Sequence, residues 1–240
     1  MTSRKSNLPL RPSLKQHLAG LTKIIRLGER KARARRAVPE GTSRLNSALR
    51  IAQDRKMLWL IRHGETEWSL SGAHTGRTDI PLTKAGEEKA IGLRDKLAGQ
   101  HFELVLTSPL QRARRTCELA GFGAQAQVEP NLVEWNYGDY EGRTTPDIRK
   151  ERPGWYLFRD GVPGGETVEQ VGVRAQCVID RAINAGGDAV LFGHGHILRV
   201  LAACWLGLPP EEGKRLVLGT AGIATLGFEH GTRVIERWNC

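Results

Sequence analysis

A histidine with an arginine before it and a glycine after it follows the first apolar run of the chain. Residues 60–66 read Leu-Ile-Arg-His-Gly-Glu-Thr, so Arg62, His63 and Gly64 open a loop at the end of an expected strand. In open α/β sheets ligands bind at the carboxyl edge of the strands. A neutral imidazole is a nucleophile that can form covalent intermediates, and Gly64 would let the backbone approach a ligand closely. The tripeptide alone does not exclude a loop histidine that merely ends a strand.

A second pair of histidines follows a later apolar run, in Gly193-His194-Gly195-His196. Two strand ends that each carry a histidine could face one pocket. A metal site is the competing interpretation, but no nearby cluster of carboxylates or cysteines completes a ligand set. We therefore expect no metal and no other cofactor.

Two further segments carry groups suited to phosphate chemistry. Arg112 lies in the first turn of an expected helix with Ser108 as its N-cap, and a helix N-terminus and an arginine both favour anions. Because Arg114 and Arg115 follow, a solvated helix arginine is the alternative. Residues 134–142 are irregular and rich in acids, aromatics and glycine, and a carboxyl group beside aromatic rings can act as a general acid.

Strand and helix patterns alternate along most of the chain. Strands are expected over residues 57–62, 102–107, 127–129 and 188–192, followed by a hairpin of residues 222–228 and 233–238. Helices are expected over residues 83–99, 109–120, 167–184 and 197–206, with Thr83 as an N-cap and glycines as stops. This order predicts a three-layer α/β/α sandwich with a mostly parallel sheet.

The net charge of +10 belongs to one end of the 240-residue chain. Residues 1–56 carry 15 Lys and Arg against 3 Asp and Glu, whereas residues 57–240 carry 21 against 23. We predict a basic, poorly ordered leader over 1–56, with a short helix around Leu14–Arg26, and one catalytic domain over 57–240. Three interpretations of residues 1–56 are ranked. The first is a disordered tail or a true translation start at Met57, the second is a targeting segment, and the third is an arm that binds nucleic acid. Nucleic acid is therefore not an expected partner of the domain.

The cysteines and the hydropathy indicate a cytoplasmic protein. Cys117, Cys177, Cys204 and Cys240 are scattered and form no Cys-x-x-Cys pair, so reduced thiols are expected. No run of 18 apolar residues exists, so no membrane partner is expected. The sequence does not fix the oligomeric state and leaves a homodimer open.

The chain resembles the histidine phosphatase superfamily, also called the phosphoglycerate mutase-like family, from about Met57 to Trp238. Four motifs carry the resemblance in order: Arg62-His63-Gly64, Ser108-Pro109-Leu110-x-Arg112-Ala113, Glu134-x-x-x-Gly138-x-x-Glu141-Gly142 and His194-Gly195. Each motif alone is weak, whereas the ordered set is specific.

The resemblance implies a mechanism and a set of roles. His63 would attack phosphorus and become phosphorylated, and Glu134 would protonate the leaving oxygen and then activate water. The transition-state charge would be stabilised by the groups around the phosphoryl group, namely Arg62, Arg112 and His194. Further substrate contacts would come from Ser69, Thr75, Gly76 and Gly195. Ser69 departs from the asparagine that many family members carry there, and its hydroxyl could replace the amide as the phosphate contact.

The subgroup signals favour hydrolysis over mutase activity. The serine at position 69 and the runs 135–140 and 193–196 look like those of small acid phosphatases and sugar bisphosphatases. The stretch Arg143–Glu166 lacks the arginine-pair insertion of cofactor-dependent phosphoglycerate mutases, which remain the alternative. Basic residues within that stretch would either hold a distal phosphate or carboxylate or form a solvated helix face: Arg143, Arg149, Lys150 and Arg152. A binding protein without catalysis is disfavoured because the catalytic residues of the motifs are all present.

Overall fold

The computed structural model describes residues 56–240, and the helix expected at Leu14–Arg26 lies outside the described residues. Within them the chain forms a mixed sheet in the order β3-β2-β4-β1-β5-β6. The strands are β1 (Leu58–Arg62), β2 (Leu104–Thr107), β3 (Gln127–Val128), β4 (Ala189–Gly193), β5 (Ile223–Glu229) and β6 (Thr232–Arg237). Strands β3, β2, β4 and β1 are parallel to one another, and the hairpin β5–β6 is added antiparallel beside β1.

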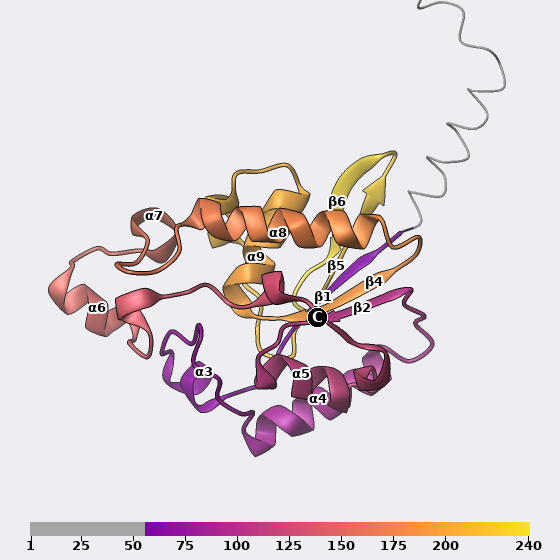
Figure 1. The fold of residues 1–240 in the computed structure, drawn as a ribbon, viewed down its shortest axis with the longest axis horizontal. Helices are drawn as coiled ribbons and strands as arrows, with labels where there is room; N and C mark the ends of the chain where they lie inside the picture. The colour runs from indigo at the N-terminus through magenta and orange to yellow at the C-terminus, as the bar shows by residue number, and fades with distance from the viewer. Residues whose placement is uncertain (1–55) are drawn as a thin grey trace, which may run out of the picture. The chain divides into compact units, whose positions relative to one another are not determined.

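Helices cover both faces of this sheet, as the sequence predicts. Figure 1 shows α8 (Val168–Ile183) and α9 (Gly195–Trp205) on one face and α4 (Lys84–Lys96) and α5 (Gln111–Leu119) on the other. Three shorter helices lie on the side toward which β1 and β4 run: α3 (Glu67–Ser71), α6 (Thr145–Glu151) and α7 (Leu157–Asp160). Four 3₁₀ turns complete the described part: η1 (Gly123–Gln125), η2 (Pro130–Leu132), η3 (Gly138–Tyr140) and η4 (Pro210–Arg215).

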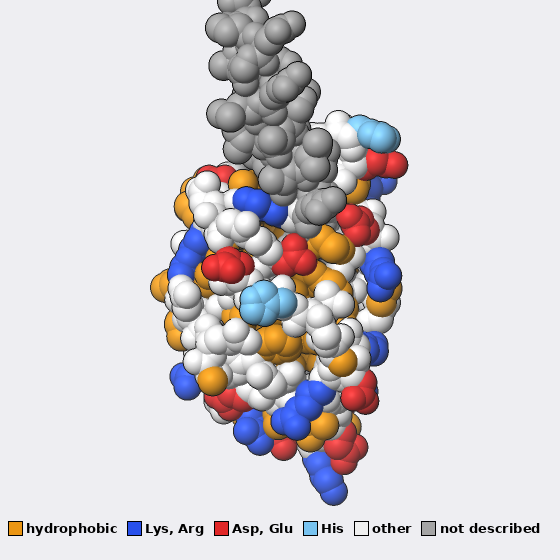
Figure 2. Space-filling view, turned by 90° about the vertical axis from the view of Figure 1, so that its right-hand side faces the viewer, with side chains coloured by type: hydrophobic (Ala, Val, Ile, Leu, Met, Phe, Trp, Pro, Cys, Tyr) orange, Lys and Arg blue, Asp and Glu red, His pale blue; other side chains and the backbone are white. Residues whose placement is uncertain are grey.

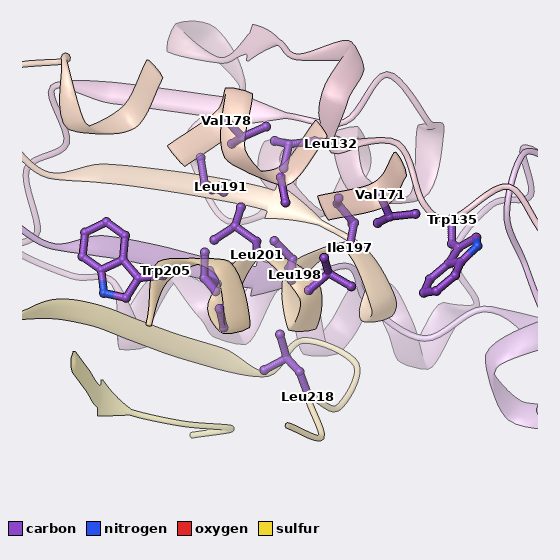
Figure 3. Close-up of a cluster of buried hydrophobic side chains, with 14 of the residues drawn as sticks. Leu132, Trp135, Val171, Val178, Leu191, Ile197, Leu198, Leu201, Trp205 and Leu218 are labelled. Carbon is purple, nitrogen blue, oxygen red and sulfur yellow. The ribbon is translucent and has the colours of Figure 1, made fainter. Parts of the chain in front are cut away.

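Alternation along the strands divides the core into two layers. Leu58 and Leu60 of β1 pack with α8 and α9, whereas Trp59 and Ile61 pack on the opposite face with α4 and α5. Successive strand residues point to opposite faces, so a strand covered on both sides must be apolar throughout. Figure 3 shows the larger cluster, with Trp205 at one end and Trp135 at the other.

Local capping explains most of the helix boundaries. The Thr83 side chain accepts a hydrogen bond from the Gly86 N–H, and Thr167 caps α8 in a capping box. Gly207, just after α9, has a left-handed φ of 72° that suits a helix stop. The prediction of Ser108 as the N-cap of α5 is wrong, because the helix begins at Gln111 after Leu110, and the Ser108 hydroxyl contacts His194 instead.

Surface charge on the described residues is mixed in sign. On the face in Figure 2, Lys and Arg side chains alternate with Asp and Glu side chains, and hydrophobic side chains lie between them. This pattern agrees with the near-neutral balance of residues 57–240. No helix in the described part of the chain is long and apolar enough to cross a membrane.

Candidate active site

The parallel strands bring the predicted residues to one edge of the sheet. Arg62 at the end of β1 pairs in register with Gly193 at the end of β4, and Thr107 of β2 pairs with Phe192. An open cavity of about 200 Å³ lies there. Six of the predicted site residues line it: Arg62, His63, Ser69, Thr75, Glu134 and Gly195.

His63 is held as a neutral imidazole with one nitrogen unused. Its Nδ1 lies 2.6 Å from the Gly64 carbonyl oxygen, which can only accept, so Nδ1 carries the proton. Nε2 is then unprotonated, and no hydrogen bond among the described residues uses it. Burial lowers the pKa of His63 well below its ordinary value, and the charges of Arg62 and Arg112 lower it further. The imidazole therefore keeps a free electron pair at neutral pH.

Arg62 presents an unsatisfied donor next to this imidazole. Its Nη1 donates to the Leu218 carbonyl at 2.7 Å, while its buried Nε has no hydrogen-bond partner. A Cβ at position 195 would lie 3.4 Å from that Nε, so Gly195 keeps the space beside the guanidinium open. An unpaired buried donor on a cation is costly, and an anion in the cavity would satisfy it.

Arg112 and His194 form a layer behind the cavity. The Arg112 Nε donates to His194 Nδ1 at 3.1 Å, which leaves His194 Nε2 to donate to the Ser108 hydroxyl at 2.7 Å. The Arg112 Nη groups donate to the carbonyls of Thr75, Gly76 and Thr78. Four of the five Arg112 donors and both His194 nitrogens are thus used within the protein. The ring centroids of His63 and His194 lie 5.2 Å apart, so His194 packs directly against the His63 imidazole.

Glu134 reaches the cavity from the loop between η2 and η3. Its Oε1 accepts from the N–H groups of Trp135 and Ile197, and its Oε2 accepts from the N–H of His196, each at 2.9 Å. Two of these donors belong to the first turn of α9, where the helix dipole favours a negative charge. One lone pair of Oε2 is left for a proton or a substrate.

An ion pair holds the segment that carries Glu134. Arg174 of α8 forms two parallel bonds to Glu166, at 2.7 and 2.9 Å, and also donates to the carbonyls of Asn131 and Val133. Trp135 lies at the end of the core cluster in Figure 3 and donates its Nε1 to the Glu166 carbonyl. The loop is therefore fixed on both sides of the carboxylate.

The remaining predicted contacts serve the fold as well as the cavity. The Ser69 hydroxyl donates to the Thr66 carbonyl in the capping box of α3, and the Thr75 hydroxyl donates to Ala73. The Gly76 N–H donates to Glu141 rather than into the cavity. The close backbone approach predicted at Gly64 is to another part of the protein, because a Cβ at this position would lie 2.4 Å from the Gly86 carbonyl oxygen.

The sequence reasoning missed several residues that line the cavity: Trp68, His74, Tyr137, His196 and Arg199. The Tyr137 hydroxyl lies 2.5 Å from His196 Nδ1, and burial lowers the pKa of His74 to about 4. His196 and Tyr137 stood within runs already singled out. Arg199 follows His196 by three residues, so helical periodicity was the available signal.

The basic residues between Arg143 and Glu166 do not line the cavity. Arg143 pairs with Glu151 at 2.7 Å and Lys150 pairs with Asp147 at 2.7 Å. Arg149 donates to the Trp155 carbonyl, and Arg152 donates to the Tyr140 hydroxyl. Of the two interpretations left open, the structure supports surface and scaffold roles for them. Among the described residues, no group of three His, Cys, Asp or Glu side chains is arranged to hold a metal ion.

Comparison with known proteins gives this arrangement a context. Residues 58–240 match the model of the histidine phosphatase superfamily (branch 1). An acid phosphatase of Mycobacterium tuberculosis is 42% identical over 185 residues, which are 73% of this chain and 88% of that protein. A sedoheptulose 1,7-bisphosphatase of Saccharomyces cerevisiae is 37% identical over 186 residues, 64% of this chain and 68% of that protein. A relative at 30% identity is described as a probable phosphoglycerate mutase.

A solved structure supports the fold. The protein of a Mycobacterium tuberculosis open reading frame superposes with a TM-score of 0.73 at 39% identity, covering 77% of this chain and 97% of that chain. The family resemblance read from the four motifs and the predicted α/β architecture are both confirmed.

The half-buried histidine His74 predicts a loss of stability in acid. Its folded pKa of about 4 lies below the ordinary 6.5, so the unfolded chain binds more protons as the pH falls. The stability that its neutral form contributes is present above pH 6.5 and is lost toward pH 4. His74→Gln should therefore reduce the drop in unfolding free energy between pH 7 and pH 5 by about 2 kcal/mol, measured by urea denaturation.

The control for this measurement is His101→Gln, which replaces an exposed histidine. It should leave the pH dependence of the wild type unchanged. An unchanged slope in His74→Gln would contradict the account of His74.

Proposed function

Because the chain belongs to the histidine phosphatase superfamily and is a phosphatase, we propose that it hydrolyses small phosphorylated metabolites, such as sugar phosphates, through a phosphohistidine on His63. The reaction uses no metal ion. The observation that carries the proposal is the unused Nε2 of His63, in a cavity that also holds the unpartnered Nε of Arg62.

In the first step, the Nε2 electron pair of His63 attacks phosphorus and the bond from phosphorus to the leaving oxygen breaks. Arg62 binds the phosphoryl oxygens as negative charge develops on them. Protonated Glu134 gives its proton to the leaving oxygen, so an alcohol departs rather than an alkoxide. Three N–H groups donate to the Glu134 carboxylate that remains and hold it in place.

In the second step, water attacks the phosphohistidine. Glu134 accepts a proton from that water as the new bond to phosphorus forms. The bond from phosphorus to Nε2 breaks, inorganic phosphate leaves, and His63 and Glu134 regain their starting protonation states. Arg112 and His194 act here mainly by holding the loop 75–78 and the position of the imidazole. Ser69, Thr75, Gly76 and Gly195 shape the wall around the substrate.

Phosphate release tests this function directly. The full chain, in EDTA, should release inorganic phosphate from members of a panel of p-nitrophenyl phosphate, sugar mono- and bisphosphates, phosphoserine and 3-phosphoglycerate. His63→Ala should abolish the release, because no other group supplies the nucleophile.

A parallel assay measures conversion of 3-phosphoglycerate to 2-phosphoglycerate with bisphosphoglycerate present. Conversion without phosphate release would contradict hydrolysis and support the mutase alternative. The relative at 30% identity, a probable phosphoglycerate mutase, is the reason to test this alternative. Release that disappears in EDTA would contradict the metal-free mechanism.

The role of Glu134 predicts a dependence on the leaving group. Glu134→Gln should lower kcat for an alkyl phosphate such as glycerol 3-phosphate by about 10²- to 10⁴-fold, with little change in KM. The loss should be smaller for p-nitrophenyl phosphate, whose leaving group needs little protonation.

Asp139→Asn is the matched control, since Asp139 is an exposed acid of the same segment. It should affect both substrates little. Equal losses for both substrates in Glu134→Gln, or a selective loss in Asp139→Asn, would move the acid role away from Glu134.

A further inference from the structure

Arg199 occupies a second position along the cavity, away from the strand ends. It lies on α9 four residues after Gly195, and both residues line the cavity. Residues four apart share a face of a helix, and the helix rises about 1.5 Å per residue. The backbone at Arg199 is therefore displaced about 6 Å along the helix from the position of Gly195.

The charge of Arg199 has no counter-ion in the described part of the chain. Its Nε donates to the Gly213 carbonyl at 3.0 Å and its Nη2 donates to the Lys214 carbonyl at 3.1 Å, and both acceptors are neutral. Its Cζ lies 4.9 Å from the centre of the Phe158 ring. The nearby carboxylate of Glu212 is paired with Lys214 at 2.7 Å. These contacts fix the guanidinium in place without neutralising it.

The cavity as a whole has an excess of positive charge. Arg62 and Arg199 line it as cations, and Glu134, already bound by three N–H groups, is its acidic residue. Burial lowers the pKa of Arg199, which means that its charge is held at a cost in free energy. A phosphoryl group beside His63 would meet Arg62 and leave Arg199 without an anion.

We propose that Arg199 binds a second anionic group, a phosphate or a carboxylate, at the far end of the substrate. The enzyme then prefers substrates with two anionic ends over matched substrates with one. This assignment rests on the proposed hydrolysis at His63 and adds the substrate class to it. It also assigns the distal-anion role to Arg199 of α9 in place of the four basic residues of the stretch Arg143–Glu166.

Two matched pairs of substrates test the preference. Fructose 1,6-bisphosphate is compared with fructose 6-phosphate, and 3-phosphoglycerate with glycerol 3-phosphate, by kcat/KM for phosphate release. In at least one pair, kcat/KM should be about 10- to 100-fold higher for the substrate with two anionic groups than for the substrate with one. This is the range expected for a charge-assisted hydrogen-bond pair. The pair that responds tells whether the second group is phosphate or carboxylate.

Substitution of Arg199 should remove the preference, which is the ratio of the two kcat/KM values in a pair. Arg199→Gln should bring it close to one, and Arg199→Lys should leave an intermediate ratio because the charge stays while the planar fork is lost. Both kcat/KM values of a pair are measured on the same preparation. The concentration of folded enzyme therefore cancels in their ratio, and a partial loss of folding does not change it. Arg149→Gln is the control, because Arg149 lies outside the cavity, and it should keep the wild-type ratio.

Calorimetric binding separates this proposal from the hydrolysis itself. The binding is measured with the His63→Ala variant, so that no substrate is turned over. In the pair that shows the preference, the ligand with two anionic groups should bind this variant more tightly than the ligand with one. Adding Arg199→Gln should abolish the difference in affinity. Absence of phosphate release from every substrate would overturn the hydrolysis but not this binding preference. A wild type with no preference in either pair, or an undiminished preference in Arg199→Gln, would overturn the role of Arg199.

Discussion

The guanidinium groups of Arg62 and Arg112, beside His63, have no carboxylate ion-pair partner among the described residues. The site depends on this excess of positive charge. Arg112 is fully buried and Arg62 partly so, and burial lowers the pKa of both. Burial lowers the pKa values of His63 and His194, and the charges of the two arginines lower them further, which keeps these imidazoles neutral. In the proposed mechanism the neutral His63 supplies the nucleophile, and the charge of Arg62, which lines the cavity, binds the phosphoryl anion.

The fold assembles this site from distant segments through a few fixed contacts. Parallel pairing sets His63 beside the end of β4, and the amino end of α9 binds the Glu134 carboxylate. The Arg174–Glu166 pair fixes the loop that carries Glu134. Because these donors and acceptors are satisfied within the protein, the Glu134 carboxylate and the His63 imidazole hold one relative geometry.

The regular elements and the family could be predicted from the sequence, since apolar alternation and caps indicate the elements and the four ordered motifs indicate the family. The role of His63 as the nucleophile stays a prediction. The short helices α3 and α7 were missed because four or five residues give too few periods to recognise. Ser108 was misassigned as a cap because its true partner, His194, lies far along the chain, just after β4. His74 needed the three-dimensional cavity, since its relevance arises only where the segment after α3 meets α9.

Trapping the covalent intermediate tests the central claim most directly. The full chain is mixed with p-nitrophenyl phosphate, quenched within milliseconds in alkaline denaturant that preserves a phosphorus–nitrogen bond, and analysed by peptide mass spectrometry. The account predicts one added phosphoryl group on the peptide that contains His63, localised to that residue and absent in His63→Ala. Steady turnover with no phosphoryl group on His63, or with the group on another residue such as His194, would contradict it.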